Sequence, residues 1–343
     1  MPQTVEDGAA DWQRLAQVYA HPRDARISFY EPTHTYSIDG DSTGWISCTG
    51  FVHSFFGHFD ADATIVKILR GRRYRGDPTY KYYGMSAGAI KAQWEASGAE
   101  ASGAGTRMHL DIEHHYNAEP QGNVEGDAYE VAPGTEWDYF TRYEREFVEP
   151  RGWHAHRTEW LVFEEGLKLC GSIDMVYAKP DGTFAIYDWK RSKEIKTEND
   201  FQSGLGPLAH LPDTNLSHYT MQLNVYRALL QRNYGITVNE LALVILHPNN
   251  ESYRVIPLPF MDAEVEGMLG ARAAALAVPG NAGHAPSVLW AQPPSKRHES
   301  PPPTARGGWA GAASEEEEAV VVGAPPQGKA SRPPANRGWV GET

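Results

Sequence analysis

The spacing of apolar and polar residues divides the first half of the chain into short extended segments and several helices. Alternation over residues 27–40 predicts a small hairpin, and residues 44–56 indicate a strand that leads into a short helix. Apolar residues then recur at helical spacing, which predicts three helices, at residues 87–97, 105–117 and 135–148. Ser86 can cap the first of these helices, and the third should end before Pro150.

The second half of the chain has the pattern of a sheet followed by further helices. Runs of β-rich residues joined by short turns predict strands near residues 156–164, 167–178 and 183–190. The segments predicted after them are a helix at 217–234, an apolar strand at 241–248, a strand at 253–258 and a helix at 262–277. Helices before and after a mostly sequential sheet indicate a fold of the α/β or α+β class.

Ionisable residues interrupt the hairpin of residues 171–190, whose two runs flank the turn Pro180-Asp181-Gly182. Side chains two apart on a strand share a face, so Asp188 and Lys190 should point to one side, and the hairpin can bring Asp174 there. Two carboxylates buried together repel each other, and a divalent cation between them removes that penalty. Carboxylate oxygens favour Mg²⁺ or Mn²⁺. The alternative is an exposed ladder in which Asp188 and Lys190 form an ordinary ion pair on the wet face.

Other polar residues stand at spacings that place them on one face of an element. His109 lies one helical turn after Gly105, which allows close approach at the start of that helix. Gln222 and Tyr226 are four residues apart on a later, otherwise apolar helix, and Glu159 lies in the strand before the hairpin. Each of these features alone is more often structural than functional, so their joint order is the informative signal.

Net charge limits the classes of function that the chain can have. Its 343 residues carry a formal net charge of −13. The excess lies in residues 1–290, because six basic and six acidic residues cancel from Ala291 onward. This balance argues against a protein that coats nucleic acid through bulk electrostatics, since such binding needs Lys and Arg to neutralise phosphates. It leaves a metal-assisted site open.

One segment departs from this acidic character. Residues 67–83 gather basic and tyrosine side chains, a mixture suited to phosphate pairing and base stacking on a nucleic-acid strand. The residues of this segment that we predict to bind nucleic acid are Arg70, Arg72, Arg73, Arg75 and Lys81. A solvated basic loop is the alternative interpretation.

Cysteine content and hydropathy bear on the compartment. Cys48 and Cys170 are too few for a disulfide framework, a four-cysteine zinc site or a four-cysteine iron–sulfur cluster, and they fit reducing surroundings. No apolar stretch approaches the ~20 residues that a membrane-spanning helix needs, and the N-terminal residues lack the pattern of a signal peptide. We therefore expect an intracellular protein of the cytoplasm or nucleus, with no membrane partner.

The composition changes sharply near residue 280. Beyond it, paired prolines interrupt Gly, Ala and Glu with few core-forming side chains, which predicts a disordered tail at residues 281–343. Two similar elements in the tail place an Arg shortly before Trp309 and Trp339, either as drift in low-complexity sequence or as a docking motif for a protein partner. Before the tail, we predict an N-terminal region at residues 1–85, which includes the basic segment, and a core at residues 86–280.

The polar positions follow a recognisable order between residues 105 and 226. That order is Gly-x-x-x-His, Glu, Gly-x-x-Asp, Asp-x-Lys and Gln-x-x-x-Tyr, supplied by Gly105 with His109, Glu159, Gly171 with Asp174, Asp188 with Lys190, and Gln222 with Tyr226. It resembles the RecB-like nucleases of the PD-(D/E)xK superfamily. Segments such as YDWKRSKEI and VILHPNN are also similar to uncharacterised nucleases of large DNA viruses, in which case the compartment would be that of a host cell.

The resemblance implies a fold, an activity and a cofactor. The fold would be a restriction-endonuclease-like core with a central mixed sheet flanked by helices. The activity would be metal-dependent hydrolysis of DNA phosphodiester bonds, as an exonuclease on single-stranded ends in DNA replication, repair or recombination. The iron–sulfur branches of the family need four cysteines, so the cluster-free exonucleases are the closer analogue, with Mg²⁺ or Mn²⁺ and no iron–sulfur cluster.

The same resemblance assigns roles to individual residues. His109, Asp174 and Asp188 would hold the metal, and Lys190 would orient the attacking water and stabilise the negative transition state. The remaining candidates of the catalytic set are Glu159 as an outer ligand, and Gln222 and Tyr226, which would hold the active face or contact the nucleic-acid backbone.

Two rival functions remain for the same residues. A catalytically inactive member of this fold, kept as a nucleic-acid-binding or scaffold protein, is the stronger rival, although the retention of Asp174, Asp188 and Lys190 argues against it. A metalloprotease with the inverted zinc motif His-x-x-Glu-His is disfavoured, because Leu110 stands three residues before Glu113, where a histidine is needed.

Overall fold

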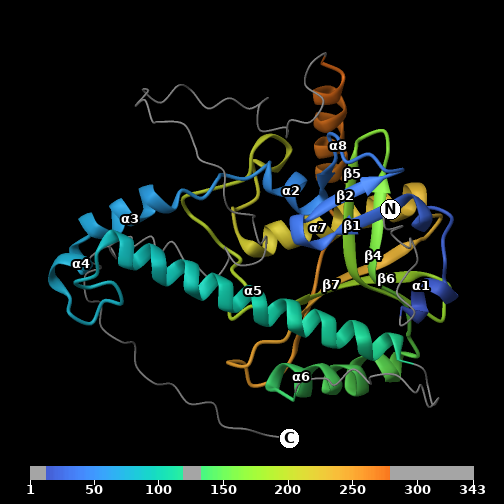
Figure 1. Cartoon of the computed structure of the whole chain (residues 1–343), viewed down its shortest axis with the longest axis horizontal. Helices are drawn as coiled ribbons and strands as arrows, with labels where there is room; N and C mark the ends of the chain where they lie inside the picture. The colour runs from blue at the N-terminus through green and yellow to red at the C-terminus, as the bar shows by residue number, and fades with distance from the viewer. Residues whose placement is uncertain (1–12, 119–132, 279–343) are drawn as a thin grey trace, which may run out of the picture.

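The computed structural model describes residues 13–118 and 133–278, and Figure 1 shows how they are arranged. These residues form a six-stranded mixed sheet with helices on both faces and a separate two-stranded hairpin. The predicted fold class, with a central mixed sheet flanked by helices, is therefore confirmed. The predicted tail with its two tryptophan elements lies outside the described residues.

The central sheet is organised around its second long strand. The strands are β3 (Ile46–Ser47), β4 (His154–Glu164), β5 (Leu169–Ala178), β6 (Phe184–Lys190), β7 (Val238–Ile245) and β8 (Arg254–Pro257). β5 pairs antiparallel with β4 and β6, and parallel with the short β3. β7 runs parallel to β6, with α7 (Asn215–Asn233) as the crossover that a parallel pair requires, and β8 runs antiparallel to β7. The three strands predicted between residues 156 and 190 are confirmed to within two residues at each end.

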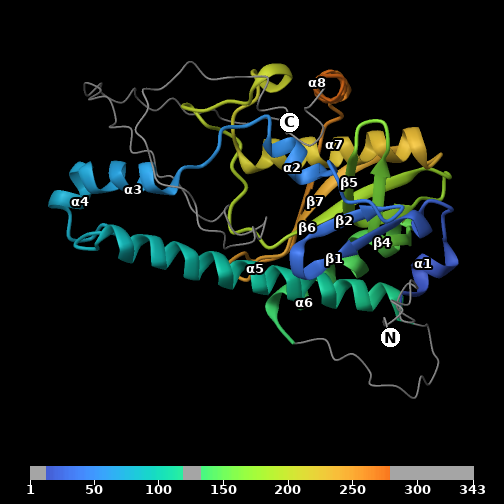
Figure 2. The same cartoon turned by 45° about the horizontal axis from the view of Figure 1, so that its top comes forward.

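Helices bury both faces of the sheet, as Figure 2 shows. α2 (Cys48–His53), α7 and α8 (Asp262–Leu276) contribute to the larger buried cluster on one face. α1 (Arg14–Val18), the second half of α5 (Ala87–Asn117) and α6 (Thr135–Tyr143) contribute to the cluster on the other face. Alternation along β6 follows this division: Ile186 belongs to the first cluster, whereas Tyr187 and Trp189 belong to the second.

The predicted N-terminal elements are present. β1 (Ile27–Tyr30) and β2 (Thr35–Ile38) form the small antiparallel hairpin. β3 leads directly into α2, which begins after Ser47, whose hydroxyl accepts a hydrogen bond from the Gly50 amide at 3.0 Å.

Two predicted helix boundaries were wrong. The helices predicted at residues 87–97 and 105–117 are one continuous helix, α5, which Ser86 caps as expected. The glycines between them do not end the helix, because their neighbours are mostly Ala, Ser and Glu and no residue of α5 has a positive φ. The helical path after α6 also continues through Pro150 and ends at Gly152, whose φ of 64° is the left-handed conformation typical of a helix end.

A part of the chain that we call the arm, residues 61–95, extends away from the sheet. It consists of α3 (Ala61–Arg70), α4 (Arg72–Gly76), the following turns and the first turns of α5. Figures 1 and 2 both show α3 and α4 at the end of α5 that is remote from the sheet. The arm has its own small buried cluster, formed by Ile65, Tyr80, Tyr82, Ile90 and Trp94.

Among the described residues, no helix combines the length and the apolar character that crossing a membrane requires.

Candidate active site

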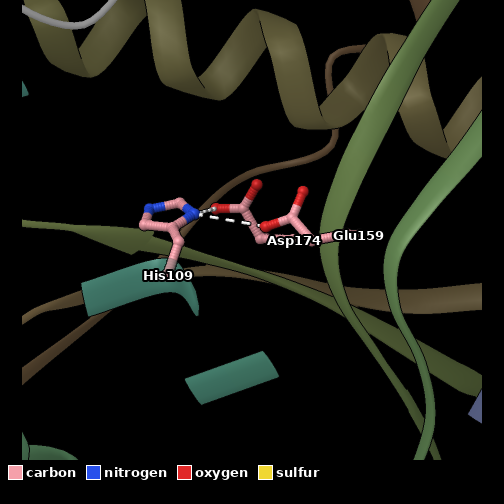
Figure 3. A group of neighbouring side chains, drawn as sticks. All are labelled: His109, Glu159 and Asp174. Carbon is pink, nitrogen blue, oxygen red and sulfur yellow. Dashed lines mark hydrogen bonds and ion pairs between the residues drawn. The ribbon is translucent and has the colours of Figure 1, made fainter. Parts of the chain in front are cut away.

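Three of the predicted residues meet where α5 crosses the sheet. His109 comes from α5, Glu159 from β4 and Asp174 from β5 (Figure 3). His109 Nδ1 lies 3.4 Å from Glu159 Oε1 and 3.7 Å from Asp174 Oδ2. One ligand atom from each residue lies within 4.8 Å of the other two, an arrangement that could hold a metal ion. We call these three residues the metal cluster.

The hydrogen bonds of His109 prepare its ring for ligation. Its Nε2 lies 3.1 Å from the Trp189 carbonyl oxygen, which can only accept, so Nε2 carries the proton and Nδ1 is directed at the two carboxylates. Burial of the ring opposes its charged form, but the charges of Asp174 and Glu159 outweigh burial and raise the pKa of His109 to about 9. The site therefore attracts positive charge at this position.

Glu159 has an unusual backbone conformation for a strand residue. Its φ is +42°, a left-handed value that costs a residue with a Cβ on the order of 1 kcal/mol. Ser172 on β5 holds the carboxylate by donating a hydrogen bond to Oε2 at 2.9 Å. With this backbone conformation and hydrogen bond, Oε1 of Glu159 faces His109, so Glu159 is one of the three residues of the metal cluster.

Asp188 and Lys190 share a face of β6, as alternation predicts, and form an ion pair of 2.8 Å. Lys190 Nζ also lies 4.7 Å from the ring centroid of Tyr219, so the ammonium contacts the negative face of that ring. Asp188 is 3% exposed, and burial together with the charge of Asp174 raises its pKa to about 6, against the opposing charge of Lys190. The alternative of a fully exposed ladder does not fit, because Asp188 is buried and the Lys190 side chain is only 20% exposed.

Asp174 links the metal cluster to β6. Its Oδ2 accepts a hydrogen bond from the Trp189 amide at 3.1 Å. Burial raises the pKa of Asp174, while the neighbouring His109 acts in the opposite direction. The charge of Asp174 acts on both His109 and Asp188, so Asp174 couples the metal cluster electrostatically to the ion pair on β6.

Gln222 and Tyr226 lie beneath β5 rather than in the metal cluster. The Tyr226 ring is 3% exposed and packs on Gly171, where an added Cβ would stand only 2.7 Å from the phenol oxygen. Gln222 Nε2 donates to Thr49 Oγ1 at 3.1 Å, which ties α7 to α2. This placement agrees with a role in holding the active face.

The predicted nucleic-acid-binding residues are exposed on the arm and do not reach the metal cluster. Arg73 contacts Asp77 at 3.5 Å and the Tyr80 ring at 4.8 Å, and Lys81 lies 4.8 Å from the Tyr82 ring. Arg70, Arg72 and Arg75 are exposed as well.

Two residues of the site were missed by sequence reasoning, although spacing pointed to both. Ser172 stands two residues before Asp174, so the two share a face of β5. Tyr219 stands three residues before Gln222 and seven before Tyr226, which places all three on one side of α7. Glu113, one helical turn after His109 on α5, accepts a hydrogen bond from Gln13 Nε2 at 3.4 Å.

Two solved structures are similar to this chain. The first is a candidate exonuclease from Eubacterium rectale, with 16% identity over 68% of this chain and 79% of its own and a TM-score of 0.34. The second is the protein SSO0001, with 13% identity over 77% of this chain and 82% of its own and a TM-score of 0.27. No curated protein sequence matches the chain.

The profile of one family covers most of the described core. The PD-(D/E)XK nuclease superfamily matches residues 79–299, more than half of the chain. That span contains His109, Glu159 and Asp174 as well as the ion pair on β6, so the matched sequence includes the whole site described above. Fold, site and sequence agree, and the chain belongs to the PD-(D/E)XK nuclease superfamily.

Proposed function

We propose that this chain hydrolyses phosphodiester bonds of DNA with Mg²⁺ or Mn²⁺, as an exonuclease that acts on single-stranded ends in DNA replication, repair or recombination. The observation that supports this most is the ion pair of the buried Asp188 and the partly exposed Lys190 beside the metal cluster. A scaffold protein gains nothing from a buried carboxylate paired with a partly exposed lysine next to three potential metal ligands, since burying a charged group is unfavourable. The pair therefore favours an enzyme over an inactive relative.

The donor atoms fit a hard divalent ion. The metal cluster offers two carboxylates and the Nδ1 of His109, and Asp188 is a third acidic group beside it. When bound, such an ion lowers the pKa of a water molecule and neutralises charge on the attacking and leaving oxygens of a phosphodiester.

The residues of the chain supply orientation and fixed charge. Asp188 and the Tyr219 ring hold the Lys190 ammonium in place beside the metal cluster, where an ammonium can act as a donor to an attacking water or to a phosphate oxygen. A preorganised cation in a partly dry site stabilises negative charge in the transition state without further reorganisation. Gln222 and Tyr226 support β5 from below and keep Asp174 in position.

The choice of substrate rests on the order of the sequence motifs. Gly-x-x-x-His before the acidic residues and Gln-x-x-x-Tyr after them support the RecB-like branch, and the chain has only two cysteines for a cluster that needs four. We therefore assign the chain to the cluster-free exonucleases of that branch.

Cleavage assays with end-labelled single-stranded, duplex and circular DNA test this proposal. We expect cleavage of linear single strands with Mg²⁺ or Mn²⁺ and none in excess EDTA. Lys190→Ala should reduce kcat by about a hundredfold or more at an unchanged melting temperature. Lys179→Ala is the matched control, because Lys179 lies at the far end of the same hairpin and pairs with Glu240. Activity in EDTA, or equal activity of the two lysine variants, would contradict the proposal.

Metal titration distinguishes the two candidate ligand sets. If Glu159 is a ligand, as its place in the metal cluster favours, Glu159→Gln should weaken Mn²⁺ binding about tenfold or more in calorimetry. If Asp188 is the ligand, as the family resemblance implies, Asp188→Asn should do so instead. If both variants bind Mn²⁺ more weakly, both carboxylates are ligands of bound ions.

A further inference from the structure

The tip of the arm carries positive charge that the rest of the arm does not neutralise. Arg70, Arg72 and Arg75 are exposed, and none of the three contacts a carboxylate in the part of the chain that the structure describes. Tyr83, in the turns between α4 and α5, is 47% exposed. In a chain with a net charge of −13, this concentration of exposed guanidinium groups is a local site that attracts anions.

The tip is far from the metal cluster. α5 is unbroken from Ala87 to Asn117, and at about 1.5 Å per residue it separates Ala87 from His109 by about 33 Å. α3 and α4 lie at that remote end in both views (Figures 1 and 2). The arginines therefore cannot contact a phosphate at the reacting bond.

Internal contacts hold the tip in place on α5. The Trp94 indole donates to the Tyr82 hydroxyl at 2.7 Å, and the Tyr74 hydroxyl donates to the Met85 carbonyl at 2.8 Å. Lys91 on α5 pairs with Asp62 on α3 at 3.1 Å. With the buried cluster of the arm, these contacts keep the tip at a defined distance from the metal cluster.

We propose that the arm tip is a second binding site for the DNA strand whose end is cleaved in the metal cluster. At about 3.4 Å per stacked nucleotide, a strand must extend about ten nucleotides from the reacting bond to reach Arg70, Arg72 and Arg75. Guanidinium groups pair with phosphates through two parallel hydrogen bonds, and the exposed Tyr83 offers a face on which a base can stack. The inference rests on the proposed function and adds a minimum substrate length to it.

Binding of short and long oligonucleotides tests the inference. The assay uses the full chain with Ca²⁺ in place of Mg²⁺ and labelled single strands of about 6 and about 30 nucleotides. The arm variant is Arg70→Gln/Arg72→Gln/Arg75→Gln. The matched control, Arg142→Gln/Arg145→Gln/Arg254→Gln, removes the same charge from the exposed Arg145 and Arg254 and the half-buried Arg142, which lie outside the arm.

We expect the natural chain to bind the long strand at least about tenfold more tightly than the short one, and the arm variant to lose most of that difference. For the arm variant and the long strand, the slope of log binding constant against log salt concentration should become shallower by about 2, because about three phosphate contacts are lost. The affinity of the arm variant for the short strand should change no more than that of the control variant. An equal effect of the arm and control variants, or equal affinity of the natural chain for both lengths, would overturn the inference.

Two further outcomes separate this inference from neighbouring ones. Length-dependent binding that requires the arm, in a chain without nuclease activity under any metal, would support the arm site while the proposed function fails. A polyglutamate peptide that competes as well as DNA of equal charge would show that the tip binds acidic protein segments, which would overturn the assignment to DNA.

Discussion

Gly105 lies one turn before His109 on α5 and faces the same side of the helix. Sequence reasoning attributed close approach to this glycine, yet no atom of the described chain would lie within 4 Å of a Cβ added there. A glycine in a helix interior costs roughly 0.5–1 kcal/mol of stability relative to alanine. The open space beside Gly105 leaves room for substrate at this position.

Gly105→Ala should therefore stabilise the fold and impair catalysis. We expect a small rise in melting temperature together with a severalfold rise in KM for DNA, because the added methyl group narrows the space next to the metal cluster. Gly103→Ala is the matched control, since Gly103 is equally open but faces away from His109. Equal activity of the two variants would show that substrate does not approach α5 here.

His156 on β4 is packed among the rings of Tyr19, Trp160 and Phe184. Burial lowers the pKa of His156 to about 4, with a smaller contribution from Arg157. Between pH 4 and the usual 6.5, the unfolded chain binds a proton here and the folded chain does not. The free energy of unfolding must therefore fall as the pH falls through this range.

His156→Phe should remove part of this acid sensitivity. Between pH 7 and pH 5 the free energy of unfolding should fall in both proteins. The fall should be smaller in the variant by on the order of 1 kcal/mol, a value that allows for the partly exposed ring. Urea unfolding at both pH values measures the difference. His154→Gln on the same strand is exposed and serves as control, so an identical pH profile for both variants would contradict the assignment.

At the scale of elements, the site depends on how closely α7 approaches β5. Gly171 makes that approach possible, since a Cβ there would lie 2.7 Å from the Tyr226 hydroxyl and 2.8 Å from Cε1 of the same ring. Tyr226 then connects to Gln222, whose contact with Thr49 fixes α2 as well. The glycine and tyrosine of the motif are thus two halves of one packing contact.

Gly171→Ala should destabilise the fold by about 1–3 kcal/mol through overpacking. Gly171→Ala/Tyr226→Leu should be less destabilised than the sum of the two single variants, because removal of the ring makes room for the methyl group. Chemical denaturation of all four proteins measures this coupling. If the losses in free energy of unfolding of the two single variants simply add in the double variant, α7 can move away from β5 at little cost.

At the scale of the whole molecule, the described core includes α8 and ends with it. Val265, Met268 and Leu269 of α8 belong to the main buried cluster, and the buried Arg272 donates to the backbone carbonyls of Leu167 and Gly44. The helix therefore ties the C-terminal part of the core to the turn between β4 and β5.

Truncation after Pro279 should accordingly preserve the fold, with a melting temperature within about 2 °C of the full chain. Truncation after Phe260 removes α8, exposes part of the main cluster and should lower the melting temperature by more than about 10 °C, or prevent folding. A large loss on truncation after Pro279 would show that residues beyond it contribute to the core.

The sequence by itself determined most elements and the face on which each polar residue stands. Alternation placed Asp188 and Lys190 together on β6, and helical spacing placed Gln222 and Tyr226 together on α7, because these relations are set by the local geometry of one element. The order of the motifs pointed to the superfamily that the profile match establishes.

Only the tertiary structure decided which of these faces meet. Glu159 reaches His109 because of a left-handed backbone at one position of β4 and a hydrogen bond from Ser172, and neither follows from periodicity. The continuity of α5 through its glycines, and hence the distance between the arm tip and the metal cluster, depends on packing at both ends of the helix. Local propensity is too weak to determine such relations, since contacts between distant segments contribute more free energy than the preferences of single residues.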